Sequence, residues 1–194
     1  MAKSSSSVYG FSLHRGLMGV ENPTSFNFVI KDSSTISIGD PVRLSTDGYL
    51  KRAAAGEAVL GVVIGIVDKD GLNVFSPRAQ GTTGSTLTPD DTVAVSSTNS
   101  SDATRKIKAQ VVLDPAGALL FKNTASTTLA QTNVGQLFDV GSTVGQIDVS
   151  TASDSNGQFQ LVALDDDSTS VGYFRLVESQ LAVGIDQGTA KVSA

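Results

Sequence analysis

The sequence predicts an all-β protein, a single sandwich-like or barrel-like domain of short antiparallel strands with long loops. Short segments with apolar or alternating side chains recur roughly 8–12 residues apart, and Gly, Asn and Asp stand between them. Only 17% of the residues are charged, Gly occurs 19 times, and Ser and Thr are abundant, a balance typical of β proteins with many turns. A length of 194 residues suits one domain with a sizeable core.

The apolar run at residues 60–67 is the expected central core strand. It is β-branched at most positions other than Gly, and it is too short and too often interrupted by Gly for a helix of about ten or more residues. Because the run is almost wholly apolar, we expect it to be buried on both faces. Short strands on either side of a turn at Thr46–Asp47–Gly48 lead into it.

Several other segments have the pattern of strands. The alternation is clearest where Ile107, Ala109 and Val111 are separated by Lys108 and Gln110, which predicts a half-buried strand. Further strands are predicted at residues 25–30, 35–38, 72–75, 92–95, 118–121, 147–149, 158–164 and 173–177.

The remaining segments are predicted to be loops, turns and a terminal arm. Residues 76–91 and 96–104 are expected to be long loops, and residues 127–137 are expected to hold one or two helical turns. The small polar residues at 1–8 predict a flexible N-terminal arm, because they bury too little surface to offset their ordering entropy. Residues 9–194 are then the β domain.

Composition excludes several classes of partner and site. The net charge of −5 disfavours nucleic acid, which requires an excess of Lys and Arg on one face. The chain has no Cys, so it can form neither disulfides nor thiolate metal sites. No apolar run approaches the roughly 18 residues of a membrane span, and the start of the chain lacks the apolar core of a secretion signal. We therefore expect a soluble protein made in the cytoplasm, with no membrane partner.

The residues for catalysis are scarce. The only histidine is His14, and the chain lacks the strand–turn–helix elbow that presents a nucleophilic serine. The three glutamates, Glu21, Glu57 and Glu178, are far apart in the chain, and nothing in the sequence pairs them as glycoside hydrolysis requires. We expect no catalytic residues, no cofactor and no enzyme activity.

Two acidic segments are candidate metal sites. Asp68, Asp70 and Asn73 begin like a calcium loop, but the twelfth position is Ala79 where such a loop needs a bidentate Glu. A tight turn is the favoured interpretation there. Consecutive carboxylates at 165–167 are expected to form a solvated loop rather than a cation site. We predict no metal.

An apolar segment near the N-terminus is the candidate interface. Glycines interrupt it, so no helix is expected, and such a segment either covers a sheet edge or reaches a neighbouring subunit. Its aromatic side chains have two interpretations, anchors for a partner or cover for the protein's own core. The candidate contact residues are Tyr9, Phe11, His14, Arg15, Leu17 and Met18.

The order of several short motifs resembles the head decoration proteins, or cement proteins, of tailed bacteriophages. The match covers most of the chain. The motifs are Tyr9–Gly10–Phe11, Arg15–Gly16, Gly39–Asp40–Pro41–Val42, residues 50–57 running into Leu60–Gly61–Val62, Val112–Leu113–Asp114–Pro115, Leu120–Phe121, residues 131–135, residues 141–145 and Phe174–Arg175–Leu176–Val177.

The resemblance implies a β-sandwich or barrel that forms a homotrimer on the outer face of an icosahedral phage head. The implied partners are the major capsid protein and other copies of the chain, and the implied location is the virion. The candidate contact residues would then meet the capsid or a neighbouring subunit, with Arg15 against an acidic capsid edge. The alternative from the fold class alone is an adhesion or carbohydrate-binding module of a virion fibre.

Overall fold

A computed structural model describes residues 10–16, 23–67, 92–94, 106–141 and 145–181. These residues form strands and one short 3-10 helix, η1 (Gln131–Asn133), and no helix among them is long and apolar enough to cross a membrane. The strands are β1 (Ser12–Gly16), β2 (Ser25–Val29), β3 (Thr35–Ser37), β4 (Pro41–Leu44), β5 (Leu50–Arg52), β6 (Gly61–Val67), β7 (Thr92–Ala94), β8 (Lys108–Leu113), β9 (Leu119–Thr124), β10 (Leu137–Val140), β11 (Ile147–Ser153), β12 (Phe159–Asp165) and β13 (Ser168–Leu176).

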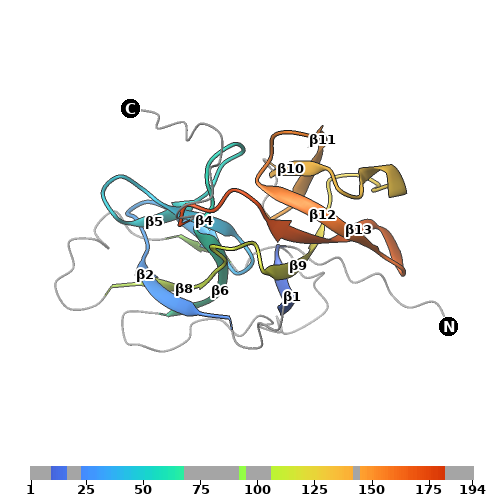
Figure 1. Ribbon diagram of the computed structural model, residues 1–194. Coiled ribbons are helices and arrows are strands. Elements are labelled where there is room, and N and C mark those ends of the chain that lie inside the picture. The colour runs from blue at the N-terminus through green and yellow to red at the C-terminus, as the bar shows by residue number, and fades with distance from the viewer. Residues whose placement is uncertain (1–9, 17–22, 68–91, 95–105, 142–144, 182–194) are drawn as a thin grey trace.

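Two antiparallel sheets pack against each other (Figure 1). The five-stranded sheet has the order β2-β8-β6-β4-β5, and the six-stranded sheet has the order β1-β9-β13-β12-β10-β11. A small third sheet pairs β3 with β7. The all-β, sandwich-like prediction is confirmed, and β6 stands in the middle of its sheet as predicted.

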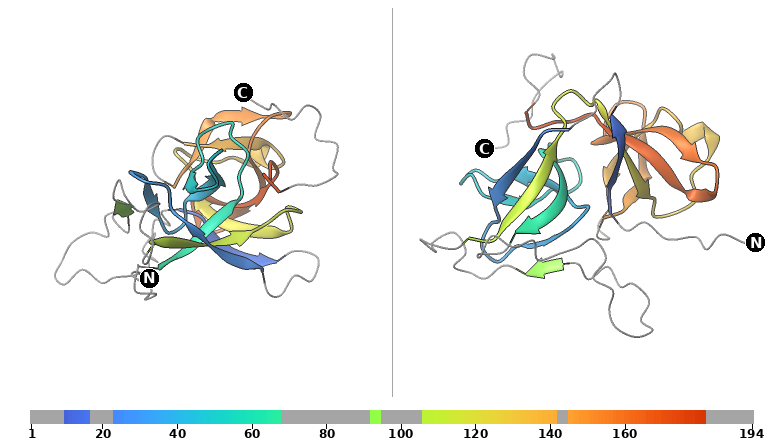
Figure 2. Two further views of the ribbon diagram at one scale, coloured as in Figure 1. Left: turned by 90° about the vertical axis from the view of Figure 1, so that its left-hand side faces the viewer. Right: turned by 90° about the horizontal axis from the view of Figure 1, so that it is seen from below.

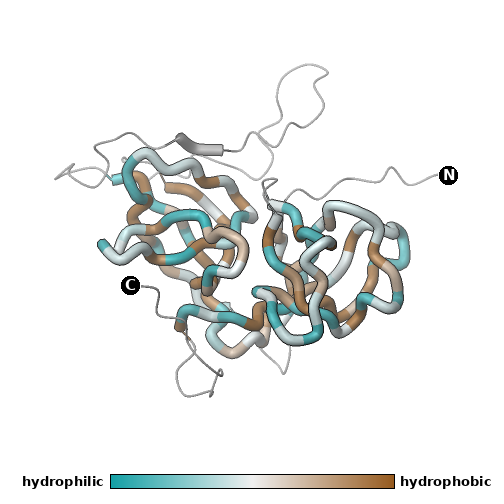
Figure 3. The backbone as a smooth tube through the Cα atoms, turned by 90° about the horizontal axis from the view of Figure 1, so that it is seen from above, coloured by the Kyte–Doolittle hydropathy of each residue, from teal (hydrophilic) through white to brown (hydrophobic). Residues whose placement is uncertain are grey.

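Each large sheet is curled, so that it encloses an apolar interior of its own (Figure 2). In the five-stranded sheet a parallel bridge joins Ile30 to Leu50, and the Lys31 N–H donates to the Leu50 carbonyl at 2.8 Å. In the six-stranded sheet a parallel bridge joins Ala125 to Ile147. Both sheets therefore bend far enough for distant strands to meet, and apolar stretches recur along the strands of each (Figure 3).

Strand β6 separates the two apolar interiors. Val63 and Ile66 are fully buried in the five-stranded sheet, whereas Val62 packs into the core of the six-stranded sheet. Gly61 permits the close strand packing, because a Cβ there would lie 2.1 Å from the carbonyl oxygen of Val112. The prediction of burial on both faces is correct except at Val67, which is half-buried, and at Ile64, which is 36% exposed and lies where a bulge shifts the pairing with β8.

Phenylalanines dominate the core of the six-stranded sheet. Phe11 stacks on Phe159 with ring centroids 4.3 Å apart, and its edge meets Phe121 at 6.2 Å. Phe138 and Phe174 form another edge-to-face pair at 6.2 Å. Such pairs add about 0.5–1.5 kcal/mol to the gain from burying their area.

Most predicted strands are confirmed within a few residues, and the predicted helical turn is the 3-10 helix η1. The segment 12–16 was expected to be irregular and is strand β1 instead. It pairs on one side only, with β9, so it needs no regular apolar alternation. Strand β13 also begins earlier than predicted, because a tight hairpin pairs Ser168 with Asp165. The predictions for residues 1–8, 72–75, 76–91 and 96–104 concern residues outside the described part.

Candidate functional site

The candidate interface residues separate into three groups. Phe11 is 3% exposed and lies in the core, so the interpretation as cover for the protein's own core applies to it. His14 and Arg15 are exposed on the edge strand β1. The other candidates, Tyr9, Leu17 and Met18, lie outside the described residues.

A row of polar side chains crosses the outer face of the six-stranded sheet. The His14 ring lies 4.6 Å from the Tyr173 ring, and the Lys122 Nζ lies 5.6 Å from the centroid of the same tyrosine. Lys122 also forms an ion pair with Asp165, whose carboxylate accepts a hydrogen bond of 3.3 Å from the Tyr173 hydroxyl. The candidate residue His14 is thus linked to strands β9, β12 and β13.

The ion pair shifts both partners toward their charged forms. Hydrogen bonding from Lys122 lowers the pKa of Asp165, and the Asp165 carboxylate raises the pKa of Lys122. The carboxylate side chain of Asp165 is only 8% exposed. Asp165 therefore neutralises Lys122 and has a structural role. This differs from the prediction that residues 165–167 form a solvated loop.

The N-terminal segment is attached to the five-stranded sheet by a close approach of two glycines. The Phe11 N–H donates to the Gly39 carbonyl at 2.9 Å, and the Gly39 N–H donates to the Val63 carbonyl at 2.8 Å. Both Gly10 and Gly39 have positive φ angles, of 84° and 90°. A Cβ on Gly39 would lie 2.9 Å from the Gly10 Cα, so only glycine fits here.

Asp40 is a buried carboxylate beside this attachment. Its side chain is 2% exposed, accepts a hydrogen bond of 2.8 Å from the Ser37 N–H, and lies 3.8 Å from the Arg52 Nε. Burial raises the pKa of Asp40 to about 6, although the Ser37 N–H and Arg52 both act to lower it. The residue fixes the turn before β4 and is not open to a ligand.

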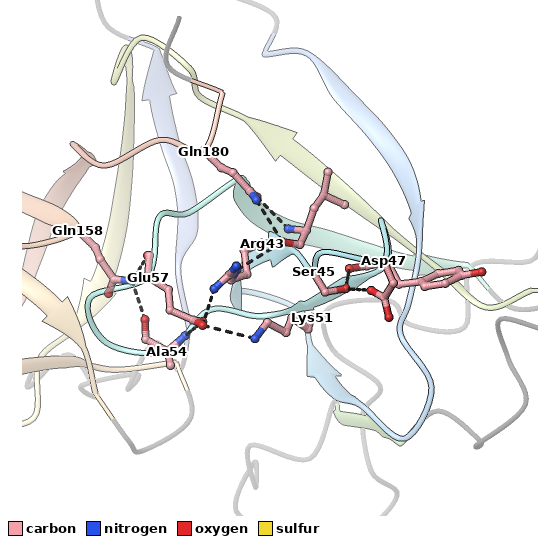
Figure 4. Close-up of polar contacts among 10 residues, drawn as sticks. Arg43, Ser45, Asp47, Lys51, Ala54, Glu57, Gln158 and Gln180 are labelled. Carbon is pink, nitrogen blue, oxygen red and sulfur yellow. Dashed lines mark hydrogen bonds and ion pairs between the residues drawn. The ribbon is translucent and has the colours of Figure 1, made fainter. Parts of the chain in front are cut away.

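Gln158 connects the two sheets. Its side-chain amide donates to the carbonyls of Ala54 and Glu57 at 2.7 and 2.5 Å, and its side-chain oxygen accepts from the Val140 N–H at 2.9 Å. Figure 4 shows Gln158 reaching from the six-stranded sheet to the loop that holds Glu57. We call Gln158, Ala54, Glu57 and Val140 the inter-sheet clasp.

Glu57 extends the clasp into the five-stranded sheet. Its carboxylate forms ion pairs with Arg43 and Lys51 and accepts a hydrogen bond of 2.9 Å from the Ala54 N–H (Figure 4). Burial acts to raise the pKa of Glu57, but these donors outweigh it and the pKa lies below the usual value. Glu57 is therefore a charged structural group.

The segment after β13 strengthens the same contact. The Val59 N–H donates to the Glu178 carbonyl at 2.9 Å, and the Gln180 N–H donates to the Val59 carbonyl at 2.8 Å. The Gln180 side chain also bonds both backbone groups of Leu44, at 2.8 and 3.1 Å. A single parallel bridge between Ser179 and Val59 thus holds residues 178–180 against the loop that leads into β6.

No metal-binding cluster is present within the described ranges, where no three His, Asp or Glu side chains converge. Burial, together with the nearby Asp139, raises the pKa of Glu178. The possible calcium loop at 68–73 lies outside the described residues.

The sequence did not single out Lys122, Tyr173 or Gln158. Each depends on strand register between segments far apart in the chain, such as the pairing of Tyr173 with Lys122. For Lys122, the sequence offered one signal: it follows the apolar Phe121, so in a strand its side chain would point to the opposite, outer face.

Comparisons with known proteins do not assign a family. No family model matches the chain, and no curated protein matches it.

Proposed function

We propose that the protein is a structural decoration protein of a tailed-phage head, which binds the outer surface of the mature capsid as a homotrimer. The observation that carries the proposal is where the motifs that resemble those of the decoration proteins lie in the fold. Gly10–Phe11 and Gly39–Asp40, two motifs from distant parts of the chain, touch each other and need glycine at the contact.

Two other motifs also contain a residue that the local backbone structure requires. Gly61 packs against the Val112 carbonyl, and Asp114 accepts hydrogen bonds from the N–H groups of Ala118 and Leu119 at 2.7 and 3.1 Å. Motifs that determine a fold are the ones that relatives with that fold share. The proposal therefore rests on the resemblance of these motifs to those of the decoration proteins and on their structural role in this chain, from which the function is inferred.

The physical role would be differential binding. A protein that binds the expanded capsid but not its disrupted state stabilises the expanded state by its binding free energy, summed over many copies. A trimer adds avidity, because three modest contacts engage together. No chemical step is needed, and we propose no enzyme activity.

The test is addition of the purified protein to phage capsids that lack it, with thermal release of packaged DNA as the readout. We expect saturable binding and DNA release at a higher temperature. A variant lacking residues 1–8 tests the arm without removing Phe11 from the core. Absence of binding at micromolar protein would refute the proposal, and binding to glycans instead would favour the adhesion module.

A further inference from the structure

Two arginines lie on the outer face of the six-stranded sheet. Arg15 is opposite Leu120, and Arg175 is opposite Gln160. Strands β13 and β9 pair Tyr173 with Lys122 and Phe174 with Phe121, and one further step in this register brings Arg175 beside Leu120. Arg15 and Arg175 therefore share one row across β1, β9 and β13, with backbones roughly 10 Å apart.

These arginines are not neutralised within the described part of the chain. Arg15 is exposed and makes no hydrogen bond or ion pair there. Arg175 is exposed and donates to the neutral Gln160 side chain at 2.7 Å. Lys122, on the same face of β9, is neutralised by its ion pair with Asp165. Among the described residues, this face therefore presents two arginines that no carboxylate neutralises, on a protein whose net charge is −5.

We propose that this face, between Arg15 and Arg175, binds an acidic segment of a protein partner through its Asp or Glu carboxylates. Guanidinium groups match carboxylates in bidentate geometry, and two of them on rigid strands can orient a segment that crosses the sheet. Strand β1 is the edge of the sheet, so a partner can approach it from the side. Nucleic acid is disfavoured because the rest of the protein would repel a long polyanion.

The inference rests on the proposed function only in expecting a protein partner. It adds Arg175 to Arg15 and specifies carboxylates as the recognised groups. On a capsid, such charge contacts would fix the orientation of the protein and speed its association more than they add to affinity.

The test uses a fluorescent oligo-glutamate peptide as the probe, with oligo-lysine and a sulfated oligosaccharide as comparisons. The full chain should bind oligo-glutamate, and more weakly as salt is raised. The double variant Arg15→Gln/Arg175→Gln should bind about tenfold more weakly or worse. The control is Lys31→Gln/Lys108→Gln, which removes the same total charge away from this face, at Lys108 on β8 and at Lys31 just after β2, where Lys31 pairs with Asp47, and should leave binding unchanged. Equal circular dichroism spectra would establish that both variants are folded.

Three results would overturn the inference: no binding of oligo-glutamate, equal weakening in both double variants, or preference for the sulfated oligosaccharide. The capsid assay is separate. If the protein binds oligo-glutamate through the two arginines but does not bind capsids, the proposed function fails and this inference stands. If both double variants bind capsids equally well and the protein does not bind oligo-glutamate, the inference fails and the proposed function stands.

Discussion

Replacing Gln158 with leucine should separate the contribution of the inter-sheet clasp from that of packing. The side chain is fully buried, and Leu is similar in size but cannot hydrogen bond. The substitution leaves the Val140 N–H without its partner in the core, at a cost of about 1–3 kcal/mol. The Ala54 and Glu57 carbonyls lie nearer the surface and can recruit water, so each adds about 1 kcal/mol. The expected loss is about 3–5 kcal/mol.

Urea unfolding followed by far-ultraviolet circular dichroism measures this loss. The urea concentration at the midpoint should fall, while the slope of the unfolding free energy against urea concentration stays the same, as for a change in stability alone. Gln110→Leu is the control, because Gln110 is half-buried and, among the described residues, its side-chain amide donates only to the Ser25 hydroxyl, at 3.1 Å. Its cost should be below about 1 kcal/mol. A loss below about 1 kcal/mol for Gln158→Leu would refute the role of the clasp.

Three further predictions concern the attachment of the N-terminal segment. Phe11→Ala should cost about 3–5 kcal/mol in thermal or urea unfolding, as for a large buried aromatic, and a near-neutral result would contradict its place in the core. Gly39→Ala should destabilise by at least about 1 kcal/mol, because of its positive φ and the 2.9 Å approach to Gly10; an unchanged midpoint would contradict this close contact. Asp40 has a folded pKa of about 6, raised from 3.8, so its contribution to stability is fully present below pH 3.8 and is lost as pH rises through about 6. This loss amounts to about 3 kcal/mol of unfolding free energy. Asp40→Asn should abolish this part of the pH dependence between pH 3.8 and 6, and equal profiles of stability against pH for the two proteins would refute the prediction.

The sequence predicted the elements whose pattern is local. Strand β6 is apolar at most positions and β8 alternates, so both were predictable, and β6 is the middle strand of its sheet. The edge strand β1 was missed for the opposite reason. It pairs on one side and exposes His14 and Arg15, so it carries little apolar periodicity.

The residues of the candidate functional site were less predictable, because they are brought together by the register between strands that are far apart in the chain. Arg15 and His14 were candidates from the sequence, but their neighbours Arg175, Lys122 and Tyr173 come from strands more than a hundred residues away in the chain. Phe11 had two interpretations that only packing could separate. Gln158 follows an Asn–Gly turn and is a polar residue with no periodic signal, so its role as a buried link between sheets could not be read from its surroundings.

A cryo-electron microscopy reconstruction of capsids mixed with the purified protein would show directly whether the protein decorates the head. We expect threefold-symmetric density on the outer surface of the capsid, into which the two packed sheets fit, with the face carrying Arg15 and Arg175 against acidic residues of the major capsid protein. Capsids without added density at saturating protein would contradict the claim that this chain is a head decoration protein.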